Sequence, residues 1–198
     1  YRDEYLHGLK QNLEFVTLSR AIDRGYHPEG FAPIDAAPVT WAGDQRHSWK
    51  SEGSGADTVD IAMDGIEGIE MAMENIMKSA KLGYNIIGSD VAGVSGKEIP
   101  PRLYIRWAQF STSCGLFLNG GHGERALWKR TPQELEIIRR FSWLHTELIP
   151  YMYSYVVEAH NGGEVLQRPV KGKYHYLFGD NFLVAPIYKD ELINEVTL

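Results

Sequence analysis

Apolar residues along the chain gather in short runs and in helical periods, and the two patterns alternate. The runs at 14–19 and 38–44 are rich in β-branched and aromatic residues, which predicts buried strands. Between about 58 and 82 the apolar positions recur every three or four residues, which predicts a helix with one buried face. The order then repeats, with a strand-like run at 84–93 and a predicted helix at 100–112. Strands that alternate with helices in this way indicate a parallel sheet covered by helices.

A long helical pattern follows and carries its own start and stop signals. Thr131 is suited to the N-cap, with Pro132 in the first turn and Glu134 positioned to complete a capping box. Pro150 is expected to break or kink this helix. The glycine pair at 162–163 is expected to end its second part.

The pattern changes after Gly163. The segments 164–170, 175–190 and 195–198 read as short strands separated by turns, with no helix between them. This change predicts a boundary between a β/α region and an all-β region. The chain also begins inside a predicted helix at 4–12, which suggests a piece of a longer protein.

Polar residues follow the strands of the β/α region. The three strands above and a fourth apolar run, at 114–118, are followed in chain order by Arg20, Asp44, Asp90 and His122. In a (β/α) barrel the carboxyl ends of the strands share one face, where active sites form. This points to an enzyme. A doubly wound open sheet produces the same alternation, so the pattern alone leaves both architectures open.

The composition and charge of the chain argue against several classes of function. The chain has 198 residues, of which 43% are hydrophobic and 23% charged, and its formal net charge is −6. This charge provides neither the basic footprint of a nucleic-acid-binding protein nor a basic segment for a membrane surface. No run approaches the roughly 18 apolar residues of a transmembrane helix. Cys114 is the single cysteine, which excludes a disulfide within the chain, and its apolar neighbours predict a buried structural thiol.

Each polar position has a structural and a chemical interpretation. Asp44, flanked by Trp41 and Trp49, could shape a turn. A carboxyl that indole rings partly remove from water also keeps its proton more readily, as the acid of a glycosidase must. Asp90 could shape its own glycine-rich loop, accept hydrogen bonds from sugar hydroxyls or bind a metal. The remaining two, His122 on a glycine-rich loop and Arg20 at a strand end, could bind substrate or make local contacts.

A metal site is the weaker interpretation of these residues. Asp44, His47, Asp90 and His122 are ligand types that could hold zinc or manganese. However, the chain has no HxH, HExxH or CxxC motif, and no phosphate loop or nucleophile elbow. The sequence therefore predicts neither a metal nor a cofactor.

Several stretches resemble the motifs of glycoside hydrolase family 31, whose members are retaining α-glucosidases and α-xylosidases on a (β/α)8 barrel. The matches occur in the family's order: LSRA (18–21), WAGDQRHSW (41–49), GSDVAGVSG (88–96), RWAQF (106–110), LIPYMYSY (148–155), RPV (168–170) and FGDNFLVAPI (178–187). Together they extend over most of the chain and are more specific than any one of them alone.

The resemblance implies a fold and a division into domains. The fold class is α/β, with the second half of a (β/α)8 TIM barrel followed by the beginning of an all-β sandwich domain. Residues 1–162 would be the C-terminal portion of the catalytic barrel, and residues 163–198 the start of the β-sandwich domain.

The resemblance also implies roles for the polar residues. Asp44 matches the general acid/base of a retaining, exo-acting α-glycoside hydrolase, while Arg20, Trp41, Asp90 and His122 match the sugar site. The expected partners are an oligosaccharide or α-glycoside and the rest of the barrel, with no nucleic acid, membrane, metal or cofactor. A homo-oligomer is compatible with the sequence, which does not indicate a cellular compartment.

The chain departs from the family pattern at several points. The nucleophile motif of the family precedes the LSRA segment and has no counterpart here, so the nucleophile is expected outside this chain. A non-catalytic carbohydrate-binding relative is the alternative. Gly120 stands where the family has an arginine. Val94 replaces a tyrosine of sulfoquinovosidases, which argues against that specificity.

Overall fold

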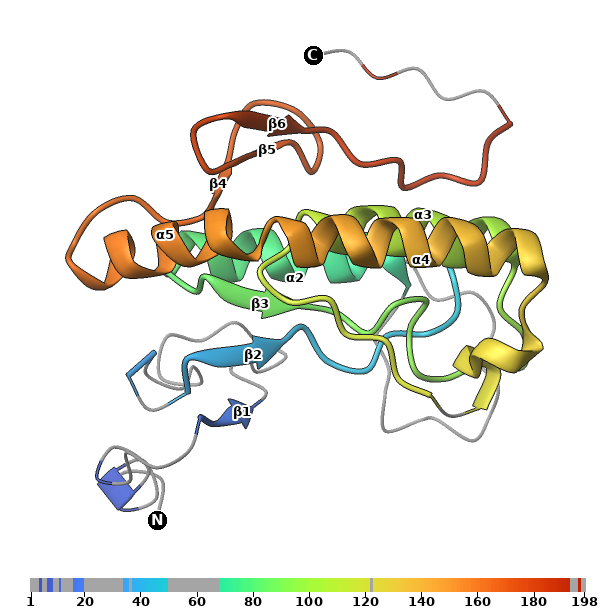
Figure 1. The fold of residues 1–198 in the computed structure, drawn as a ribbon, viewed down its shortest axis with the longest axis horizontal. Coiled ribbons are helices and arrows are strands. Elements are labelled where there is room, and N and C mark those ends of the chain that lie inside the picture. The colour runs from blue at the N-terminus through green and yellow to red at the C-terminus, as the bar shows by residue number, and fades with distance from the viewer. Residues whose placement is uncertain are drawn as a thin grey trace.

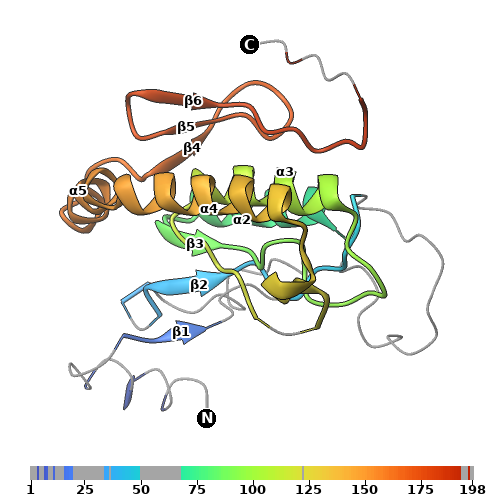
Figure 2. The same ribbon diagram turned by 45° about the vertical axis from the view of Figure 1, so that its right-hand side comes forward.

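Three layers make up the described part of the protein. The computed structural model describes residues 4, 7, 8, 11, 16–19, 34, 35, 37–49, 68–121, 123–192 and 196. A small parallel sheet, a layer of helices and a small antiparallel sheet lie one above another (Figure 1). The view turned by 45° shows the same order, with the helices between the two sheets (Figure 2).

The parallel sheet contains three of the predicted strands. They are β1 (Leu18–Ser19), β2 (Val39–Trp41) and β3 (Ile86–Gly88), which lie in that order in the sheet. Both strand pairs are parallel, and Trp41 lies opposite Gly88. Each strand falls within a predicted apolar run, and the prediction of parallel pairing is confirmed.

The prediction of a fourth strand at 114–118 is wrong, because this segment does not form a regular strand. The structure has an isolated parallel bridge between Asp90 and Leu118, and the Leu116 amide donates to the Ile87 carbonyl at 3.2 Å. Gly88 lies so close to this segment that a Cβ there would be 2.0 Å from the Leu116 carbonyl oxygen. The segment therefore runs beside β3 where the strand was expected, and it contacts β3 closely without forming a regular strand.

The helix predicted over about 58–82 does not run unbroken through Gly68. The observed helix, α2 (Ile69–Lys81), begins after Gly68, whose ψ of −142° is not helical. A Cβ at Gly68 would lie 1.7 Å from the Ser48 carbonyl oxygen, and the Ile69 amide donates to that oxygen at 2.9 Å. The first residue of α2 is therefore bonded to the loop after β2. Residues 58–67 lie outside the described residues.

The long C-terminal helical segment is divided into two helices next to Pro150, as predicted. It forms α4 (Pro132–Glu147) and α5 (Ile149–His160), and Pro150 lies in the first turn of α5. At the start of α4 the predicted capping box is confirmed. The Thr131 amide donates to Glu134 at 2.9 Å, and the Glu134 amide donates to the Thr131 hydroxyl at 3.3 Å. None of the described helices is long and apolar enough to cross a membrane.

The hydrophobic core lies where the helices meet the two sheets. The remaining helix, α3 (Pro101–Thr112), runs along α4 (Figures 1 and 2). The largest fully buried apolar side chains come from both sheets, two helices and the residue before β4: Trp107, Tyr104, Tyr176, Phe178, Ile69, Met73, Ile76, Ile87, Leu103 and Leu166. Burial of each such side chain stabilises the fold by roughly 1.5–3 kcal/mol. Cys114 is also fully buried, and burial raises the pKa of its thiol, as expected of a structural cysteine.

Short antiparallel strands follow α5. That helix ends before Gly162, which has a φ of 85°. Beyond it, β4 (Gln167–Pro169), β5 (Tyr176–Phe178) and β6 (Phe182–Val184) form a three-stranded antiparallel sheet in sequence order. The predicted change of pattern after Gly163 is therefore confirmed within the described residues. The last predicted strand, at 195–198, lies almost entirely outside them.

Candidate active site

Two of the predicted site carboxylates lie at the carboxyl ends of adjacent strands. Asp44 comes three residues after β2 ends, and Asp90 comes two residues after β3 ends. Because Trp41 and Gly88 are paired in a parallel register, both aspartates emerge at the same edge of the sheet. The arrows of β2 and β3 in Figure 1 point toward this edge.

Asp44 is half-buried at a turn beside an indole ring. Gly43 has a φ of 103°, in the left-handed region that favours glycine, and turns the chain out of β2. The Trp41 indole Nε1 donates to Asp44 Oδ1 at 3.4 Å. The other flanking indole, Trp49, packs against the hydrophobic core. Asp44 therefore lies after the strand, where the sequence placed it, and one of its two flanking indoles contacts it.

The β2 loop (residues 42–49) and the β3 loop (residues 89–96) are bonded to each other through their backbones. The Val94 amide donates to the Gln45 carbonyl at 2.7 Å, and the His47 amide donates to the Ser95 carbonyl at 2.8 Å. Asp44 and Asp90 thus belong to one connected pair of loops, which limits their independent motion.

Two side chains that the sequence did not assign as catalytic or sugar-binding support these loops. Gln45 is fully buried and donates from Nε2 to the Ala42 carbonyl at 2.9 Å. His47 Nδ1 lies 2.6 Å from the Ala92 carbonyl of the β3 loop. Since a carbonyl only accepts, Nδ1 carries the proton in this bond. Burial lowers the pKa of His47, with a smaller contribution from the positive charge of Arg125.

Asp90 is held by a buried arginine. Arg125 lies in a short 3-10 helix, η3 (Gly123–Arg125), and its guanidinium forms an ion pair with Asp90. The side chains of Arg125 and Asp90 are 3% and 11% exposed. The sequence motifs did not indicate this arginine, because the partners are far apart in sequence. The sequence showed only that Arg125 follows the glycine-rich stretch at 119–124.

The remaining predicted site residues are placed only in part. Trp41 lies at the end of β2 against Asp44. Arg20 and His122 lie outside the described residues. Across the described ranges, no group of three or more histidine, cysteine, aspartate or glutamate side chains is arranged to hold a metal.

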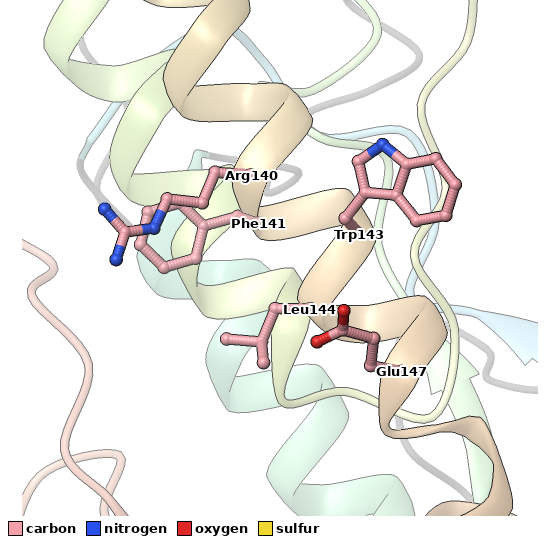
Figure 3. Close-up of a pocket in the computed structure, with 5 residues that line it drawn as sticks. All are labelled: Arg140, Phe141, Trp143, Leu144 and Glu147. Atoms are coloured by element: carbon pink, nitrogen blue, oxygen red, sulfur yellow. The ribbon is translucent and has the colours of Figure 1, made fainter.

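A hollow on the outer side of α4 lacks the features of a catalytic site. It has a volume of about 550 Å³ and is lined by Arg140, Phe141, Trp143, Leu144 and Glu147 (Figure 3). All five belong to a single helix, so no polar groups converge on the hollow from different elements, as they do in most ligand sites. The strand edge that carries Asp44 and Asp90 is therefore the candidate active site.

Parallel strands under helices, with two aspartates after the carboxyl ends of adjacent strands, define a β/α domain. The sequence model of the glycosyl hydrolases family 31 TIM-barrel domain matches residues 28–155. The match covers more than half of the chain, and the chain belongs to this family.

Two curated relatives show how much of a family protein the chain represents. An alpha-xylosidase from Emericella nidulans is 31% identical over 121 residues, which cover 55% of this chain and 15% of the relative. Alpha-glucosidase 2 from Bacillus thermoamyloliquefaciens is 25% identical over 172 residues, which cover 80% of this chain and 20% of the relative. The chain therefore spans no more than a fifth of the length of these two proteins.

Solved structures agree on the fold. A cycloalternan-degrading enzyme from Trueperella pyogenes aligns with a TM-score of 0.70 at 18% identity, over 96% of this chain and 26% of that one. A GH31 family sulfoquinovosidase from E. rectale aligns with a TM-score of 0.60 at 21% identity, over 81% of this chain and 25% of that one. The α/β class and the TIM-barrel domain expected from the sequence are confirmed by these matches.

Proposed function

We propose that this chain belongs to a retaining, exo-acting α-glycoside hydrolase, of which residues 1–162 form the second half of the barrel. Residues 163–198 would begin the β-sandwich domain. The parallel sheet under helices, followed by an antiparallel sheet, supports this division. The named activities of the relatives, alpha-xylosidase and alpha-glucosidase, support an α-linked terminal sugar as substrate.

The main observation behind the proposal is that Asp44 and Asp90 follow the carboxyl ends of two adjacent parallel strands. Asp44 is half-buried, follows β2 and accepts a hydrogen bond from the Trp41 indole. In the proposed reaction Asp44 donates a proton to the leaving oxygen while a nucleophilic carboxylate attacks the anomeric carbon. Asp44, then ionised, removes a proton from the water that hydrolyses the glycosyl-enzyme. We place the nucleophile outside this chain.

The sugar would be bound by residues of the same edge. Asp90 would accept hydrogen bonds from sugar hydroxyls, and Trp41 would border the sugar ring beside Asp44. Arg20 and His122 complete the proposed site on the basis of their motifs. The chemistry needs no metal and no cofactor, because two carboxylates suffice for the double displacement.

A panel of nitrophenyl α-glycosides tests the proposal on the complete protein that contains these residues. We expect turnover of at least one α-glycoside, and a decrease in kcat of about 10²–10⁴-fold in Asp44→Asn for substrates with poor leaving groups. Asp190→Asn is the matched control, because Asp190 is an exposed aspartate paired with Arg102. Binding of a glycoside without turnover of any panel member would favour a non-catalytic carbohydrate-binding relative.

A further inference from the structure

The ion pair between Asp90 and Arg125 joins a proposed site residue to a buried arginine. Arg125 exposes 3% of its side chain and Asp90 exposes 11%. A carboxylate removed from water to this extent retains its charge only if a partner compensates for the lost hydration. The guanidinium is suited to this because it stays protonated and has a rigid set of donors.

The backbone around Gly120 leaves room for the guanidinium. A Cβ built on Gly120 would lie 2.5 Å from one terminal nitrogen of Arg125 and 2.6 Å from its Cζ. Gly120 does not have a positive φ, so a side chain is compatible with its backbone. The space above it is occupied by Arg125, and an added side chain would displace the guanidinium from Asp90.

The segment that carries Arg125 is itself fixed to the core. The fully buried Tyr104 of α3 donates its hydroxyl to Asn119 Oδ1 at 2.7 Å, and the same hydroxyl lies 3.2 Å from the Arg125 carbonyl. The Arg130 guanidinium lies over the Tyr104 ring, 5.4 Å from its centroid. Arg125 therefore extends toward Asp90 from a backbone that α3 holds in place.

We propose that Arg125 is a positioning residue of the sugar site, whose guanidinium holds the Asp90 carboxylate in place from the space left by Gly120. The inference rests on the proposed function, in which Asp90 accepts hydrogen bonds from the sugar. Arg125 acts through Asp90: the ion pair offsets the hydration that the buried carboxylate loses and limits its rotation. The space above Gly120 is thereby filled by a guanidinium that enters from η3.

Sugar affinity is the first test, measured by calorimetry on the complete protein with Asp44→Asn to prevent turnover. The probes are methyl α-glucoside, methyl α-xyloside and methyl α-galactoside. We expect Arg125→Met to raise the dissociation constant about 10- to 100-fold, as the loss of a positioning partner does in other proteins. Arg125→Lys should give an intermediate loss, since it keeps the charge but not the planar donors. Gly120→Ala should also weaken binding, although it leaves every charge in place.

A relocated arginine separates positioning from general stability. In Gly120→Arg/Arg125→Met the guanidinium is supplied from the other side of the same space, and binding should recover at least threefold relative to Arg125→Met. Arg168→Met is the control for the loss of an arginine ion pair away from the site, because Arg168 of β4 pairs with Asp180, whose side chain is 70% exposed. It should lower the melting temperature without a change in the dissociation constant.

Hydrogen exchange provides a second readout that does not depend on a sugar. Amides of residues 90–96 should lose protection in Arg125→Met and Gly120→Ala, and keep it in Arg168→Met. If no probe binds to the parent protein but residues 90–96 lose protection in Arg125→Met, the proposed function and the sugar-site role of Arg125 are overturned. Only the structural part, in which Arg125 holds the loop of Asp90, then stands. If Asp90→Asn weakens binding while Arg125→Met stays within twofold of the parent, or if residues 90–96 keep full protection in Arg125→Met, the positioning role is overturned.

Discussion

The hydrophobic core and the two loops after β2 and β3 are stabilised by different interactions. In the core, fully buried apolar side chains from α2, α3 and the antiparallel sheet contact one another. The loops contribute Ala42, Val91 and Ala92 to the same core, but they are joined to each other by backbone hydrogen bonds and contain one partner of a buried ion pair. Four residues there have positive φ angles: Gly43, Ala92, Gly93 and Gly96.

The difference shows where stability and chemistry reside in this domain. Core stability depends on filled volume, so it tolerates exchange among apolar residues of similar size. The loops depend on particular donors, acceptors and backbone angles, because a buried polar group without its partner is costly. Substitutions in the core should therefore reduce stability more than activity, and substitutions in the loops should do the reverse.

The largest expected effect is on stability, from Trp107→Ala. Trp107 is fully buried and its indole donates to the Ser89 hydroxyl at 2.8 Å. We expect a decrease of about 3–5 kcal/mol in the free energy of unfolding, measured by urea denaturation of the complete protein. Trp128→Ala is the control, since Trp128 is 80% exposed, and should change stability by less than about 0.5 kcal/mol. A similar loss for both variants would contradict the proposed role of the core.

A smaller effect on stability, with a larger effect on activity, is expected from Gly93→Ala in the β3 loop. Gly93 has a φ of 82°, and a Cβ would lie 2.6 Å from the Arg46 carbonyl oxygen. We expect a loss of about 1–3 kcal/mol in the free energy of unfolding from the strained backbone. The kcat/KM of the remaining folded protein should also fall, because the shift separates the two loops. Gly121→Ala, with no atom within 4 Å of the added Cβ, should leave stability unchanged.

The smallest expected effect is on the pH dependence of stability. Burial lowers the pKa of both His47 in the loops and His145 on α4. The unfolded chain then binds more protons than the folded chain as the pH falls below about 6.5, so the folded state loses stability there. His47→Asn and His145→Asn should each reduce this loss in thermal melts at pH 7.5 and 5.5. Added salt should weaken the effect of His47 more, because Arg125 contributes to its shift and no charged group is among the causes for His145.

Sequence reasoning succeeded where the signal was local. The capping box of Thr131 and Glu134, the break at Pro150 and the end of α5 near Gly162 all depend on residues within a few positions of one another. The strands β1 to β3 were found from their continuous apolar runs, and parallel pairing placed Asp44 and Asp90 at one edge.

The features that sequence reasoning missed depend on contacts between distant segments. Gly68, at the start of α2, lies against the Ser48 carbonyl, and Gly88 lies against the segment expected to form the fourth strand. The Asp90–Arg125 ion pair joins residues 35 positions apart. No local pattern of apolar and polar residues carries information about such pairs.

The central claim is that Asp44 supplies the proton to the leaving group. Its most direct test is the kcat/KM of Asp44→Asn relative to the unsubstituted complete protein, on a natural α-linked disaccharide and on the matching α-glycosyl fluoride. A fluoride departs with little help from an acid, so we expect a loss of at least about 10²-fold for the disaccharide and a much smaller loss for the fluoride. Equal rates for the two proteins on the disaccharide would contradict the assignment of Asp44.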